Sequence, residues 1–175
     1  MTRKVLLPRD INGRLYRLTE LVEEVNGILL YRRQNESCPL EALFMTGTGS
    51  EGHVQAQPDR IEVTNEFFRR NPDYQFVKFH THSKGTIRTY GKYYAKHFSQ
   101  GDLSEIKEQL RDDSEFMALL VTPETKLLCG MDNPELRVVD DFPGYRTASP
   151  TISGQLRSIA RELGYYLNRF EARMR

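Results

Sequence analysis

Two histidines and an aspartate are spaced so that they could share a metal ion. His80 and His82 end the segment YQFVKFHTH, residues 74–82, whose alternation of apolar and polar side chains predicts a strand. Alternate residues of a strand point to one face of a sheet, so both imidazoles would lie on the same side. Asp102 follows in the first turn of a helix that we predict from Ser99 onwards. Two histidines and one carboxylate leave the fourth position of a tetrahedral zinc site for water, which is typical of catalytic zinc.

Each of these residues also has a simpler interpretation. Two histidines on a strand can pack against their neighbours without a metal. Ser99 is a suitable N-cap, and an aspartate in the first turn of a helix interacts favourably with the helix dipole. Only the order of the two motifs, His-x-His followed by Ser-x-x-Asp, favours the metal site.

The elements that must position these residues are intermixed helices and strands. An apolar stripe predicts a helix over residues 14–23, and segment 46–60 reads as a polar, glycine-containing surface loop. Segment 61–73 fits either a short helix or a strand edge. We expect strands over residues 27–33, 41–47, 74–82, 116–123, 126–132 and 136–142. The sequence therefore predicts an α/β domain with a central mixed β-sheet flanked by helices.

The length of 175 residues suits one domain with its own core. We expect that domain over residues 1–142, a linker over 143–151, and an amphipathic helix over 152–175 that packs on the domain or on a partner. The 25 basic and 24 acidic residues nearly balance, so any basic site must be local. Cys38 and Cys129 form no CxxC pair, which argues against an all-cysteine zinc site or a disulfide framework. We find neither a signal peptide nor an apolar run of ~20 residues, and we expect a cytoplasmic protein.

The order of these motifs resembles the JAMM/MPN (JAB) family of zinc metalloproteases. His80-x-His82 and Ser99-x-x-Asp102 are followed by a buried strand that ends in Pro, Leu119–Pro123. The family also carries an upstream Glu-x-x-Gly-x-Leu pattern, which Glu24 to Leu29 match here. The resemblance extends over roughly residues 14–132.

The resemblance implies a fold, an activity and a set of roles. The fold would have MPN/JAB layers similar to those of cytidine deaminases, and the activity would be zinc-dependent isopeptidase cleavage of ubiquitin-like proteins or their conjugates. His80, His82 and Asp102 would ligate Zn²⁺. Glu24, rather than its neighbour Glu23, would be the general base and later the general acid, and Ser99 would stabilise the oxyanion.

The chain departs from the family pattern between the second histidine and the serine. Ser83 stands where the family usually has Pro, and residues 83–98 form an insertion. The insertion is basic and aromatic, and we expect substrate binding from Lys84, Arg88, Tyr90, Lys92 and Tyr93. We favour a clamp that holds the extended tail of a ubiquitin-like substrate by strand addition. The alternatives are a solvated loop and nucleic-acid binding through residues 84–96.

Two other functional classes stay open beside the zinc isopeptidase. One is a non-catalytic MPN-type scaffold, whose members typically lose metal ligands. The other is a RadC-like DNA-associated protein, which the basic insertion suggests.

Overall fold

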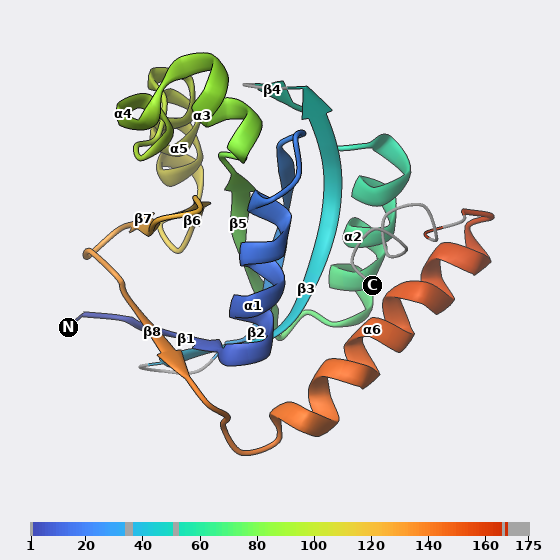
Figure 1. Cartoon of the computed structure of the whole chain (residues 1–175). Helices are drawn as coiled ribbons and strands as arrows, with labels where there is room; N and C mark the ends of the chain where they lie inside the picture. Colours follow the sequence, from blue (N-terminus) through green and yellow to red (C-terminus); the bar gives the residue numbers. More distant parts are fainter. Residues whose placement is uncertain (1, 34–36, 51–52, 166, 168–175) are drawn as a thin grey trace.

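The computed structural model describes residues 2–33, 37–50, 53–165 and 167 (Figure 1). In these ranges the strands are β1 (Lys4–Pro8), β2 (Val25–Arg32), β3 (Ser37–Ser50), β4 (His53–Val54), β5 (Tyr74–Thr81), β6 (Met117–Val121), β7 (Lys126–Gly130) and β8 (Glu135–Val139). The helices are α1 (Arg9–Thr19), α2 (Pro58–Arg70), α3 (Lys84–Tyr90), α4 (Lys92–Ala95), α5 (Gln100–Asp112) and α6 (Tyr145–Glu162). The strands form one sheet of order β7-β6-β5-β2-β3-β1-β8, with β4 paired to β3.

The sheet is mixed because its centre is antiparallel and its flanks contain parallel pairs. β2 runs antiparallel to both β3 and β5, whereas β5 and β6 are parallel and α3, α4 and α5 connect them. β3 pairs with β2 along most of its length and with β1 only near its start, at Ser37–Pro39. Figure 1 shows β3 as a long curved strand with β1 and β8 crossing near its lower end. The prediction of an α/β domain with a central mixed sheet is confirmed.

Two apolar clusters hold the helices on the sheet. Successive residues of β2 belong to different clusters, because successive side chains of a strand point to opposite faces of the sheet. Leu29 packs with Leu15 of α1 in one cluster, and Leu30 packs with Phe67 of α2 and Leu156 of α6 in the other. The strand is therefore apolar at consecutive positions, which is typical of a strand buried on both faces.

The predicted strands are all present, although their ends shift by up to four residues. β3 extends to residue 50 and so includes part of the predicted surface loop 46–60. The ambiguous segment 61–73 is mostly helical, since Pro58 begins α2 at the first turn, where a proline loses no helix hydrogen bond. The first helix covers 9–19 rather than 14–23, because Ile11 already belongs to its buried face.

The last helix begins and ends earlier than predicted. α6 starts at Tyr145, inside the predicted linker 143–151, because Tyr145 is buried and its hydroxyl donates to the Asp10 carboxylate at 2.6 Å. It ends before Gly164, whose φ of 80° suits glycine. There the amide of Gly164 donates to Arg161 and that of Tyr165 to Ala160, the pattern of a Schellman motif. The rest of the predicted helix 152–175, from residue 168 onwards, lies outside the described residues.

No helix in the described part of the chain combines the length and the apolar character that a membrane crossing requires.

We expect Leu156→Ala to lower the free energy of unfolding by about 2–5 kcal/mol, because it leaves a cavity between α6 and the sheet. Urea denaturation would measure this loss against Gln155→Ala, an exposed neighbour on the same helix, which should change stability by less than about 0.5 kcal/mol. An unchanged main transition in Leu156→Ala would show that α6 folds apart from the sheet.

Candidate metal centre

A cleft lies where the end of β5 meets the beginning of β2 and the first turn of α5. Its volume is about 310 Å³, and its lining is mostly polar. The lining residues are Glu24, Asn26, Val54, Lys78, His80, His82, Ser99, Gly101, Asp102 and Glu105. Figure 1 shows α3, α4 and α5 grouped beyond the end of β5. The structure thus brings all five predicted catalytic and metal-binding residues to one cleft.

His80, His82 and Asp102 converge closely enough to hold one metal ion. One potential ligand atom from each lies within 4.8 Å of the others. His80 is the second-last residue of β5, whereas His82 follows the strand and donates its backbone N–H to the carbonyl of Val121 at 2.9 Å. The two imidazole rings are 5.2 Å apart between centroids. This geometry is compatible with the metal site that the His-x-His spacing predicts.

The orientation of the His82 ring is set by α4. Its Nδ1 lies 2.9 Å from the carbonyl oxygen of Ala95. A carbonyl only accepts hydrogen bonds, so in the neutral ring Nδ1 carries the proton and Nε2 is the unprotonated nitrogen, the kind of atom that binds a metal. Metal-binding histidines are commonly fixed by such a bond from their other nitrogen.

Asp102 is held by the N-terminus of α5. Its Oδ2 accepts from the backbone N–H of Ser99 at 2.7 Å, and its own N–H donates to the Ser99 hydroxyl at 3.1 Å. This reciprocal pair is a capping box. The simpler interpretation of Ser99 and Asp102 as helix-start residues is therefore correct, and it coexists with their place in the cleft.

The protonation states in the cleft suit a cation. Burial raises the pKa of Asp102, but the His80 ring and Ser99 outweigh it and hold that pKa well below its usual range. Burial, and then the proximity of His80, lower the pKa of His82, while the Ala95 carbonyl and Asp102 act in the opposite direction. An ionised carboxylate and a neutral imidazole are the forms that bind metals.

The structure offers one direct test of fit for zinc. Nε2 of His80 is buried and, among the described residues, has no hydrogen-bond partner. It lies 3.5 Å from Oδ2 of Asp102, which is too long for a strong hydrogen bond. Two ligands of a tetrahedral zinc with bonds of about 2.0–2.1 Å are about 3.3 Å apart. The separation therefore suits two ligands of a shared ion, and the donor set of two histidines and one carboxylate fits zinc.

Glu24, the residue immediately before β2, lines the same cleft. It is 3% exposed, and its Oε1 accepts from the Thr86 hydroxyl at 2.6 Å. The next residue, Val25, donates its N–H to the hydroxyl of Thr81, which stands between the two histidines. Glu23, the neighbour that sequence reasoning rejected, is not among the residues that line the cleft.

Gly27, three residues after Glu24, allows β2 to lie close to its neighbours. A Cβ at this position would be 2.4 Å from the carbonyl oxygen of Phe44 and 2.6 Å from the Phe79 ring. The register of β2 against β3 also shifts between Asn26 and Gly27. The glycine of the Glu-x-x-Gly motif therefore has a packing reason, because a side chain there would clash with the backbone of β3 and with the Phe79 ring of β5.

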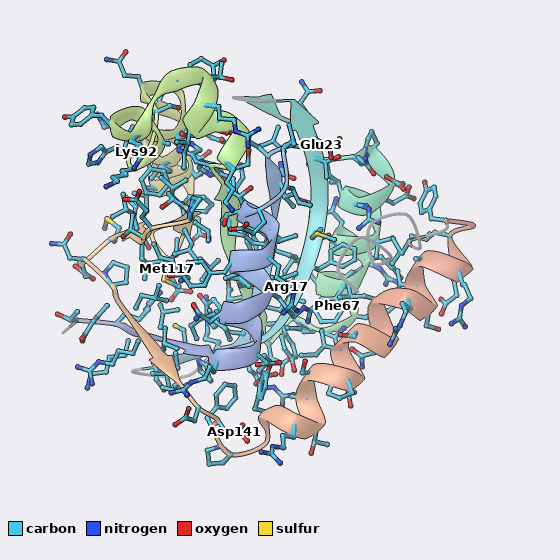
Figure 2. The ribbon with its side chains drawn as sticks, in the orientation of Figure 1. Arg17, Glu23, Phe67, Lys92, Met117 and Asp141 are labelled. Carbon is cyan, nitrogen blue, oxygen red and sulfur yellow. The ribbon has the colours of Figure 1, made fainter. Side chains whose placement is uncertain are left out.

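The insertion 83–98 folds mostly into α3 and α4 rather than into a loop. Lys84 forms an ion pair with Glu20, and Lys96 forms one with Glu124 at 2.5 Å. Tyr93 is 85% exposed, and Figure 2 shows Lys92 on the outer side of this group of helices. None of the five predicted substrate-binding residues lines the cleft. Substrate binding by Lys84, Arg88, Tyr90, Lys92 and Tyr93 stays a prediction.

Sequence reasoning missed three residues that shape the site. Thr86 hydrogen-bonds to Glu24, and the Ala95 carbonyl hydrogen-bonds to His82, but nothing in these two residue types indicates such contacts. Asn26 lines the cleft directly opposite His80 in the β2–β5 register. A single asparagine inside an otherwise apolar strand was a usable signal, since a buried polar group needs a partner. Its Oδ1 accepts from the Thr46 hydroxyl at 3.2 Å.

No protein-family model matches the chain, and no curated protein matches it. Among solved structures, the chain is similar to the solution structure of protein DSY2949 from Desulfitobacterium hafniense, with a TM-score of 0.53. The two sequences are 17% identical, and the alignment covers 80% of this chain and 95% of that one. At this level of identity the likeness concerns the fold alone.

We expect the purified protein to bind about one Zn²⁺ per chain. Asp102→Asn should weaken the zinc affinity by more than about 100-fold, because residues that only hydrogen-bond to a metal ligand typically cost 10- to 100-fold when they are lost. Asparagine can still accept the Ser99 N–H, so α5 keeps its cap. Isothermal titration of the metal-free protein measures the affinity.

The matched control is Glu105→Gln, which removes another carboxylate from the same cleft. The Glu105 carboxylate pairs with Lys78 rather than with the histidines. Equal losses in Asp102→Asn and Glu105→Gln would contradict the assigned ligand set.

Proposed function

We propose that the protein is a JAMM-type zinc metallopeptidase, an isopeptidase that removes or processes ubiquitin-like modifiers. The observation that carries this proposal is the convergence of His80, His82 and Asp102 in a cleft that a buried carboxylate, Glu24, enters from a different element. A structural role for the histidines does not explain why the buried Nε2 of His80, 3.5 Å from Oδ2 of Asp102, has no hydrogen-bond partner among the described residues, nor why Glu24 is buried in the same cleft.

Zinc, when bound by His80, His82 and Asp102, would lower the pKa of a water molecule to about 7 and so supply a nucleophile at neutral pH. The carboxylate of Glu24 would take a proton from that water and deliver it to the leaving amine. The hydroxyl of Ser99 accepts from the Asp102 amide, so its own proton can be donated to the oxyanion that forms on the substrate. Burial of Glu24 and His82, together with the hydrogen bonds between Asp102 and Ser99, would hold these side chains in place before substrate arrives.

The choice of substrate and of fold family rests on the sequence resemblance. We propose ubiquitin-like proteins or their conjugates as substrates, MPN/JAB layers similar to those of cytidine deaminases as the fold, and the cytoplasm as the location. The similarity to DSY2949 is compatible with a shared fold and says nothing of activity.

The two alternative functions receive less support from the structure. A non-catalytic scaffold has no need of a complete ligand set, yet a candidate for each role lines the cleft. Three of the four cations in residues 84–96, namely Lys84, Lys92 and Lys96, each lie within ion-pair distance of a glutamate, so nucleic-acid binding there would have to replace those pairs.

We expect Glu24→Gln to lower kcat/KM by about 100- to 10,000-fold while zinc stays bound, because it removes the proton acceptor and no ligand. Cleavage of a panel of ubiquitin-like fusions by the zinc-loaded protein measures this loss. A chelator should abolish the activity of the wild type, and added zinc should restore it.

Glu23→Gln is the control, since it changes the adjacent glutamate without altering the cleft lining. The proposal fails if the wild type binds no zinc after loading, or if Glu24→Gln cleaves the panel as fast as the wild type.

A further inference from the structure

The first turn of α3 lies against the short segment that carries Glu24. Ser83, the N-cap of α3, donates its hydroxyl to the carbonyl of Val22 at 2.7 Å. Three residues later, Thr86 donates its hydroxyl to Oε1 of Glu24 at 2.6 Å. One helical turn therefore binds the backbone before Glu24 and the carboxylate itself.

The local structure of α3 aims the Thr86 hydroxyl. The backbone N–H of Ser83 donates to Oγ1 of Thr86 at 3.2 Å, and this bond completes the capping box of α3. Because the oxygen accepts from Ser83, its own proton is left to point at Glu24. Ser83 and Thr86 are both 0% exposed, so solvent cannot easily replace this donor.

The other end of the insertion supports the opposite side of the cleft. The Ala95 carbonyl in α4 accepts from Nδ1 of His82, and Ala95 is 1% exposed. The insertion therefore contacts both the proposed base and one proposed ligand through buried polar atoms. A mobile loop that only grips substrate requires neither contact.

We propose that Thr86 is a positioning residue, which holds Oε1 of Glu24 and so fixes the orientation of the carboxylate in the cleft. Helices α3 and α4 thus form part of the framework of the site. This inference rests on the proposed function and names a residue through which the insertion acts on the reaction.

Kinetics of two Thr86 variants test the role of the hydroxyl. Thr86→Val keeps the shape of the side chain and removes the hydrogen-bond donor. We expect kcat to fall by about 10- to 100-fold, the range typical when a hydrogen bond that supports the residues of a metal site is lost. KM should change by less than about twofold, because the interaction orients a reacting group rather than substrate. Thr86→Ser restores the donor and should recover most of kcat.

The control for a lost buried threonine hydroxyl is Thr64→Val in α2, at a residue that does not line the cleft. Its hydroxyl donates to the Arg60 carbonyl at 2.8 Å, so the variant carries a comparable structural loss. It should keep the kcat of the wild type, and zinc binding should be unchanged in all three variants.

Crystal structures of the metal-free wild type and of Thr86→Val give a readout that is independent of activity. The Glu24 carboxylate should keep one conformer in the wild type and in Thr86→Ser, and should rotate or spread over several conformers in Thr86→Val. An unchanged carboxylate in Thr86→Val overturns the inference.

The outcomes separate this inference from the proposed function. If Glu24→Gln is inactive and Thr86→Val retains the kcat of the wild type, the positioning role is wrong and the peptidase stands. If the zinc-loaded wild type cleaves nothing, the peptidase is wrong, and the crystal structures alone decide whether Thr86 positions Glu24.

Discussion

The site depends on the register between β2 and β5. Asn26 pairs with His80 in this antiparallel ladder, and the residues just before β2 therefore lie beside the residues just after β5. The bond from the Val25 amide to Thr81 fastens this end of the ladder. A slip of one residue would turn His80 to the opposite face of the sheet and move Glu24 along the cleft. The apolar residues on both faces of β2 prevent such a slip, because it would exchange their two clusters.

The same hydrogen bonds serve the fold and the site. The capping box of α5 satisfies the free amides at its N-terminus, and it also fixes the carboxylate of Asp102 and the hydroxyl of Ser99. The capping box of α3 does the same for Thr86 and, through it, for Glu24. Each helix start would form without any chemistry in the cleft. Orientation of the reactive groups therefore adds little further ordering cost once the helices are folded.

A feature of the fold or of the site can be predicted from the sequence when neighbouring residues alone encode it. His80, His82, Ser99, Asp102 and Glu24 were found because short spacings and their order along the chain identify them. Thr86 and Ala95 were not, since their partners lie 62 and 13 residues away and no local pattern encodes those pairs. The start of α6 was missed for a related reason: the contact of Tyr145 with Asp10, 135 residues away, outweighs the helix-breaking composition around it. Its end was encoded locally, in Gly164, and could have been predicted.

Ser83 shows how the insertion and the site fit together. A proline after His82 would stiffen the chain by fixing φ, but it could donate no hydrogen bond. Ser83 uses both its groups: the backbone N–H binds Thr86, and the hydroxyl binds Val22. Stiffness at this point therefore comes from buried hydrogen bonds rather than from a ring. Those bonds require the first turn of α3 to be present, so the serine at this position and the helix that follows it belong to one structural solution. The longer connection between β5 and α5 is thereby tied to the segment that carries Glu24.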